Sequence, residues 1–155
     1  MTRVELLIAA GEGESIEFKQ QLPESDVQGV MKTVAAFANG GGGALLFGID
    51  NDGLVVGAGS DRESIDRLTS LISDRVRPHV HFTINMTNVD GLDVLVVDVP
   101  AGADTPYGVG TNDRDVVYYV RRGATSFPAS PADVRSFVRA RLSVANEQHY
   151  PFPLP

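Results

Sequence analysis

The chain has 155 residues, a length typical of a single domain, and its 43% hydrophobic and 21% charged residues are near the averages for globular proteins. It contains no cysteine, which excludes disulfides, thiolate nucleophiles and zinc–thiolate sites. No run of about 18 apolar residues is present, so the sequence predicts no membrane span. The absence of cysteine suits a cytosol, and we expect a cytoplasmic protein. The 20 acidic residues outnumber the 13 lysines and arginines and give a formal charge of −7, which disfavours non-specific binding of nucleic acid over the whole surface.

The first third of the chain predicts a strand, a helix and a buried strand. Apolar and charged residues alternate in residues 15–20, which is the period of a half-buried strand, so Glu17 and Lys19 share one face. Apolar residues recur at helical spacing in residues 27–38. Residues 44–49 are apolar on both faces, and this predicts a strand in the middle of the sheet.

The middle of the chain predicts hairpins and a second helix. Turn residues at 50–53 precede a short apolar strand at 54–56. An apolar stripe over residues 65–76 predicts a helix that ends before Pro78. Two alternating segments between residues 80 and 99 are joined by Asp90-Gly91 and predict a second hairpin.

The last part of the chain predicts a surface loop, a strand and a third helix. Residues 100–115 are rich in Gly, Asp, Thr and Pro, and residues 116–122 form the last expected strand. Ser130-Pro131 is typical of a helix start. The expected core face of this helix is Val134, Phe137, Val138 and Leu142.

Together these elements predict an α/β (α+β) fold with one mixed sheet of about six strands and three packing helices. We expect one domain over residues 1–145, followed by an extended, proline-rich tail over residues 146–155.

Three blocks of sequence resemble the AlbA-2 domain of Schlafen proteins and bacterial regulators. They are GEGESIEFK at residues 11–19, the segment from AFANGGGG to LFGID at residues 36–50, and YYVRRGAT at residues 118–125. The resemblance implies this fold and, for the bacterial members, a DNA-binding part of a transcriptional regulator. Related animal Schlafen domains include metal-dependent endoribonucleases, whose acidic residues match Glu12, Glu17 and Asp50 here.

Three such carboxylates are suitable ligands for Mg²⁺ or Mn²⁺, the only cofactors that the sequence suggests. Lys19 lies on the same strand face as Glu17 and is placed to neutralise a phosphate. If the protein is a nuclease, the catalytic residues are therefore Glu12, Glu17, Lys19 and Asp50, and the metal ligands are the three acids.

Other interpretations of these residues stay open. Glu14 competes with Glu12 for the first position, and Asn51 and Asp52 compete with Asp50 for the last. The charged pair on the first strand is equally typical of a solvated strand face, and the two aspartates are typical of a turn.

The run Gly40 to Gly43 follows a helix and precedes a strand, whereas a phosphate-binding loop follows a strand and opens a helix. We therefore expect these glycines to end the helix and to permit close packing against the sheet.

A nucleic-acid-binding surface is expected from Lys19, Tyr119, Arg121 and Arg122. Tyr119 and Arg121 share one strand face and Arg122 points to the other, since side chains alternate along a strand. An aromatic ring beside a guanidinium suits stacking on a base or contact with a phosphate, and it also suits an ordinary exposed sheet edge.

The leading functional prediction is a nucleic-acid-binding, more specifically DNA-binding, regulatory domain of a transcriptional regulator. A metal-dependent endoribonuclease is the first alternative. The second alternative is a non-catalytic assembly domain in which a sheet edge pairs with a second copy to form a homodimer.

Overall fold

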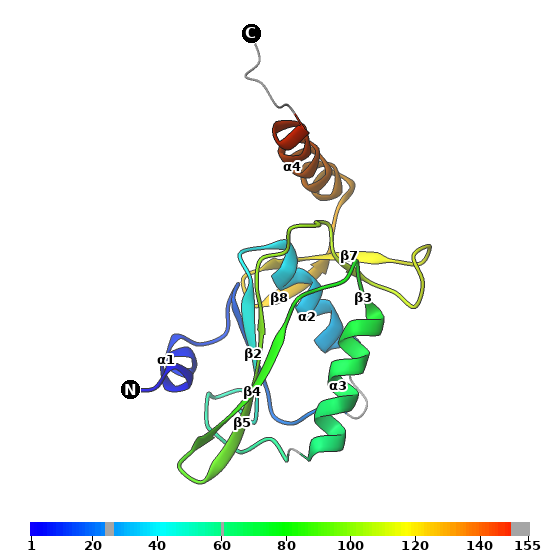
Figure 1. Cartoon of the computed structure of the whole chain (residues 1–155). Helices are drawn as coiled ribbons and strands as arrows, with labels where there is room; N and C mark the ends of the chain where they lie inside the picture. The colour runs from blue at the N-terminus through cyan, green and yellow to red at the C-terminus, as the bar shows by residue number, and fades with distance from the viewer. Residues whose placement is uncertain (24–26, 60, 150–155) are drawn as a thin grey trace.

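The described residues form two four-stranded sheets and four helices (Figure 1). The structure is a computed structural model that describes residues 1–23, 27–59 and 61–149, with side chains up to residue 143. The helices are α1 (Arg3–Ala10), α2 (Val27–Asn39), α3 (Arg62–Arg75) and α4 (Pro131–His149). The strands are β1 (Ile16–Lys19), β2 (Gly43–Phe47), β3 (Val76–Arg77), β4 (Thr83–Val89), β5 (Leu92–Val99), β6 (Gly108–Val109), β7 (Val117–Arg122) and β8 (Thr125–Pro128). The predicted α+β class is confirmed, although the described strands are eight in two sheets instead of about six in one.

The first sheet has the strand order β1-β2-β5-β4. β1 runs parallel to β2, and the other two pairings are antiparallel, so the sheet is mixed as predicted. Leu45 and Leu46 of β2 point to opposite faces, and both side chains are fully buried. The apolar segment predicted for the middle of the sheet is therefore an internal strand that is covered on both sides.

A helix covers each face of this sheet. Val4 of α1 packs on the face that carries Ile16, Leu46 and Val96. α1 was not predicted from the sequence. It begins where the Thr2 hydroxyl accepts a hydrogen bond from the Glu5 backbone N–H at 3.2 Å. The opposite face packs against α2.

The second sheet has the order β3-β6-β7-β8, and α2 lies between the two sheets. One buried cluster joins α2 to β2 and β5 of the first sheet and to β6 and β7 of the second. Three short strands of this sheet, β3, β6 and β8, were not predicted. The strand predicted at residues 54–56 is reduced to a single bridge between Ile49 and Val55.

The glycine run ends α2 and passes close to the backbone of β5. Gly42 has φ of +85°, and its N–H donates to the Phe37 carbonyl at 3.0 Å. A Cβ at Gly42 would lie 2.7 Å from the Val99 carbonyl oxygen. The local interpretation of the run, as a helix end and a close-packing segment, agrees with this geometry.

The last helix differs from its prediction in two ways. α4 begins at Pro131 as expected, but it continues to His149, so residues 146–149 are helical and not extended. The predicted tail residues 150–155 lie outside the described residues. Val134 and Phe137 are half-buried, whereas Val138 and Leu142 are exposed, because α4 projects away from the two sheets (Figure 1). The expected core face is therefore correct only for the first turns.

Within the described part of the chain, no helix combines the length and the hydropathy that crossing a bilayer requires.

Candidate functional site

β1 directs Glu17 into the space between the two sheets. Ile16 and Phe18 face α1, so Glu17 and Lys19 face the side of α2. Both charged residues are partly buried, and the Glu17 side chain is mostly covered. The interpretation of this pair as a solvated strand face is therefore wrong for Glu17.

Arg121 of β7 meets Glu17 from the second sheet. Its Nη2 lies 2.8 Å from the Glu17 carboxylate, and the Arg121 side chain is only 4% exposed. The guanidinium also donates to the Gly13 and Ile16 carbonyls at 3.0 and 3.3 Å and to the Ser126 hydroxyl at 3.2 Å. The Cζ atom of Arg121 lies 5.2 Å from the centre of the Phe37 ring. Arg121 thus joins β1, β7 and β8 through a buried cation.

Glu12 joins the same cluster. Its carboxylate accepts a hydrogen bond from the Phe18 backbone N–H at 3.0 Å and lies within hydrogen-bonding reach of the Glu17 carboxyl. Burial raises the pKa of Glu17, and the Glu12 carboxyl raises it further, although Arg121 acts in the opposite direction. The structure therefore brings together two of the three predicted acids.

Asp50 does not join them. Its Oδ1 accepts hydrogen bonds from the backbone N–H groups of Asp52 and Leu54, both at 2.9 Å, so Asp50 holds the turn after β2. The turn was one of the two interpretations of Asp50 that the sequence left open. Among the described residues no group of three or more histidine or acidic side chains is arranged to hold a metal ion. The predicted site of Glu12, Glu17 and Asp50 for Mg²⁺ or Mn²⁺ does not fit this geometry.

The expected nucleic-acid surface is also rearranged. Tyr119 shares a face with Arg121 as predicted, but that face points to α2, and both side chains are buried. Lys32 of α2 places its Nζ 5.4 Å from the centre of the Tyr119 ring. Tyr119 and Arg121 therefore offer no exposed surface for stacking on a base. Arg122, which points the other way, has a side chain that is 64% exposed.

Arg122 reaches the start of α4. Its Nη2 lies 3.2 Å from the Asp133 carboxylate, which also accepts a hydrogen bond from the Ser130 backbone N–H at 2.9 Å. The Ser130 hydroxyl in turn accepts from the Asp133 N–H at 3.1 Å, so the two residues form a reciprocal cap. The hydrogen bonds from Ser130, followed by the charge of Arg122, lower the pKa of Asp133. This predicted helix start is thus fixed to β7.

Asn39, the last residue of α2, has a structural role that was not predicted from the sequence. Its Nδ2 donates to the carbonyls of Tyr107 and Tyr119 at 2.8 and 2.7 Å, and its Oδ1 accepts from the Tyr107 N–H at 2.6 Å. One amide side chain therefore ties α2 to the loop before β6 and to β7. No local pattern reveals this role, because the partners are 68 and 80 residues away in the sequence.

The arginines of α4 were also missed, although a count of charge along the chain reveals them. Residues 116–155 contain five arginines and two acidic residues, a net charge of +3. Residues 1–115 contain eight basic and eighteen acidic residues, a net charge of −10, and the two parts sum to −7. Arg135, Arg139 and Arg141 are all exposed. The acidic protein therefore carries four exposed arginines, Arg122 and these three, in a segment whose net charge is positive.

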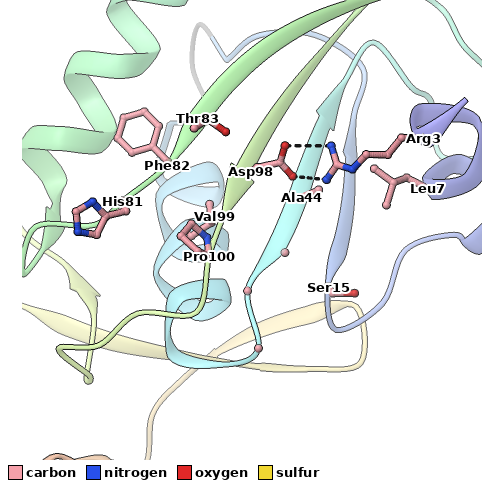
Figure 2. Close-up of a pocket in the computed structure, with 13 residues that line it drawn as sticks. Arg3, Leu7, Ser15, Ala44, His81, Phe82, Thr83, Asp98, Val99 and Pro100 are labelled. Atoms are coloured by element: carbon pink, nitrogen blue, oxygen red, sulfur yellow. Dashed lines mark hydrogen bonds and ion pairs between the residues drawn. The ribbon is translucent and has the colours of Figure 1, made fainter.

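A cavity lies where the first sheet meets α1 (Figure 2). It measures about 680 Å³ and includes the backbone of Gly41 to Gly43 in its wall. Arg3 and Asp98 both line it and form two hydrogen bonds with each other, the longer at 3.1 Å (Figure 2). The bond to Asp98 raises the pKa of Arg3. Each of these charges is neutralised by the other, so the pair directs no net charge into the cavity.

The Schlafen AlbA_2 family model matches residues 12–130. The chain belongs to this family. The match includes Glu12, Glu17, Asn39 and Arg121 and ends immediately before α4, so the basic helix lies outside the part that defines this AlbA_2 domain.

Solved structures with the same fold include the protein DIP2311 from Corynebacterium diphtheriae, with a TM-score of 0.64 and 24% identity. That match covers 90% of this chain but only 28% of the other, so this chain spans less than a third of that protein. A second is the N-terminal domain of a Nitrosomonas europaea protein named "Putative ATP-dependent DNA Helicase RecG-related Protein". It has a TM-score of 0.56 and 27% identity, and the match covers 84% of this chain and 92% of that domain. No curated protein matches the chain.

Proposed function

We propose that this AlbA_2 domain binds nucleic acid as the DNA-binding part of a transcriptional regulator, and that Arg122 and the arginines of α4 form its contact surface. The family and the name of the helicase-related neighbour support an association with nucleic acid. The observation that carries the proposal is the segregation of charge, +3 in residues 116–155 against −10 in the rest.

The physical basis is electrostatic. Exposed guanidiniums bind phosphate oxygens and release the counterions that surround the nucleic acid, and this release drives association. The acidic remainder of the domain repels the phosphates, so the ligand is held on one side only. Tyr119 and Arg121 do not contact the nucleic acid in this arrangement, because both side chains are buried. They support the fold around β7 instead.

Fluorescence anisotropy with labelled duplex DNA, single-stranded DNA and RNA over a range of salt concentrations tests the proposal. We expect tighter binding at low salt. The plot of log K against log salt has a negative slope, which becomes less steep by about 0.9 for each lost contact with a B-DNA phosphate. The double variant Arg135→Gln/Arg139→Gln should weaken binding and flatten this slope.

The matched control is Arg62→Gln/Arg114→Gln, which removes two exposed charges from the acidic part of the chain. We expect this variant to bind as the unmodified protein does. Absence of binding at low salt, or equal losses in both double variants, would contradict the proposed surface.

The endoribonuclease alternative is favoured by one observation, the contact between Glu12 and Glu17. It is disfavoured by the turn role of Asp50 and by the ion pair that Glu17 makes with Arg121. Incubation of labelled RNA with the protein and Mg²⁺ or Mn²⁺ separates the two functions. We expect binding without cleavage, whereas chelator-sensitive cleavage that is lost in Glu17→Gln would establish the nuclease.

A further inference from the structure

α4 exposes an apolar stripe between arginines. Val134, Val138 and Leu142 recur every four residues and therefore lie on one face of the helix. Their exposure increases along the helix, from half-buried Val134 to 42% for Val138 and 58% for Leu142. Arg135 and Arg139 lie beside this stripe. We call the exposed face formed by Val138, Leu142, Arg135, Arg139 and Arg141 the arm.

A second apolar surface lies on the turn after β2 and the start of β5. Its exposed apolar residues are Leu54, Val56 and Leu92, and the first of these is 63% exposed. The loop after Val56 runs beside β5, because the Ala58 N–H donates to the Asp93 carbonyl at 2.8 Å. A Cβ at Gly57 would lie 3.3 Å from the Leu92 side chain. These contacts place the loop that follows Val56 beside Leu92.

This second surface is acidic. Asp52 is exposed in the same turn as Leu54, and Asp90 and Asp93 are exposed on either side of Leu92. Neither of the segments 50–61 and 78–113 contains a lysine or an arginine. We call this group of exposed residues around the turn after β2 and the start of β5 (Leu54, Val56, Leu92 and these three aspartates) the acidic patch.

The arm and the acidic patch lie at opposite ends of the molecule, since α4 projects from one end and the β4–β5 hairpin extends at the other (Figure 1). They therefore cannot meet within one chain. Each combines exposed aliphatic residues with charges of one sign, and the signs are opposite. We propose that the arm of one copy docks on the acidic patch of a second copy, so that the protein associates head to tail.

Charge selects this pairing over the symmetric ones. Two arms face to face would bring six arginines together, and two patches would bring six aspartates together, three from each copy in both cases. The mixed contact covers both apolar surfaces and pairs the opposite charges. Nucleic acid alone would neutralise the arginines but would leave Val138 and Leu142 exposed to water.

A head-to-tail contact leaves one arm and one patch unoccupied at the ends of every open assembly, so association continues beyond a dimer until the assembly closes into a ring. The inference does not depend on nucleic-acid binding, because assembly is measured in its absence. Nucleic acid and the acidic patch are both negatively charged, so we expect them to compete for the arginines of the arm.

Sedimentation velocity of the full chain without nucleic acid, over a hundredfold range of concentration, tests the inference. We expect the mean mass to rise beyond that of a dimer and to fall at high salt. The arm variant Val138→Ser/Leu142→Ser and the patch variant Leu54→Ser/Leu92→Ser should each remain monomeric. The control Leu6→Ser/Val117→Ser, which changes two exposed apolar residues outside both surfaces, should assemble as the unmodified chain does.

The decisive sample is an equimolar mixture of the two variants. The patch variant retains its arm and the arm variant retains its patch, so the mixture should form a 1:1 dimer and nothing larger. A monomeric unmodified chain at every concentration, assembly that persists in both variants, or a mixture that stays monomeric would overturn the inference. Assembly that stops at a dimer and is lost only in the arm variant would do the same, because it would indicate contact between two arms.

Discussion

The residues at the junction between the two sheets differ from those of α4 in their burial. At the junction Glu17, Asn39 and Arg121 are covered by other elements, and their polar atoms bond to partners from distant parts of the chain. On α4 the arginines and the aliphatic residues Val138 and Leu142 are exposed. Burial therefore assigns the conspicuous polar residues of the junction to the fold, and exposure makes α4 the better candidate for contact with other molecules.

The largest expected effect is that of Arg121→Ala. Removing the guanidinium leaves the Glu17 carboxyl and two backbone carbonyls without this donor in a buried site, and the loss of one partner of a buried ion pair costs about 3–5 kcal/mol. Arg122→Ala, the matched exposed control on the next residue, should cost at most about 1 kcal/mol. Urea denaturation of both variants measures the free energy of unfolding, and similar losses would mean that Arg121 does not hold the junction.

Asn39→Ala should have the next largest effect on the free energy of unfolding. It removes three hydrogen bonds of 2.6–2.8 Å between α2, the loop before β6 and β7, and the expected cost is about 2–4 kcal/mol. Asn85→Ala, at an exposed position of β4, should change the free energy of unfolding by no more than about 0.5 kcal/mol. The same denaturation experiment compares them. An Asn39→Ala protein as stable as the Asn85→Ala protein would show that water replaces these bonds without cost.

The glycine run offers a comparison between adjacent residues. Gly42→Ala places a Cβ at φ of +85° and 2.7 Å from the Val99 carbonyl oxygen, and we expect a loss of about 2 kcal/mol. Gly41→Ala meets no atom within 4 Å and has no positive φ, so its effect should stay within about 0.5 kcal/mol. The difference between the two midpoints of thermal unfolding is the measurement. A stable Gly42→Ala protein would mean that the loop shifts away from β5.

Local patterns in the sequence were sufficient for the elements that are stabilised locally. The period of two around Glu17, the helical stripe of α2 and the two-faced apolar strand β2 are all recovered in the structure. Short elements such as β6 carry too few residues for a period to be recognised. The arrangement of the second sheet depends on pairings that no local pattern encodes.

The candidate site was harder to predict because burial was unknown. Tyr119 and Arg121 share a face as predicted, but the alternation along β7 does not reveal which face α2 covers. Asp50 and Asp52 have the same side chain, and only the hydrogen bonds distinguish them. The basic character of residues 116–155, in contrast, is present in the sequence and becomes visible when charge is counted by segment.

The smallest expected effect concerns the protonation of Glu17. Because burial and Glu12 raise its pKa above the ordinary value of 4.5, the folded state binds this proton more tightly than the unfolded state does. The resulting stabilisation is fully present below about pH 4.5 and is lost as the pH rises through the raised pKa. Glu17→Gln, which carries no titrating group at this position, should lack this loss. The free energy of unfolding of the variant, minus that of the unmodified protein, should therefore increase with pH from about 4.5 upward and then become constant. Urea denaturation at intervals from pH 4 to pH 8 measures this difference, and the lowered pKa values of Asp61 and Asp133 affect both proteins equally. Glu14→Gln, at an exposed position of the same loop, should give no comparable trend. A difference that decreases with pH would show that Arg121 dominates and that Glu17 is held as a carboxylate.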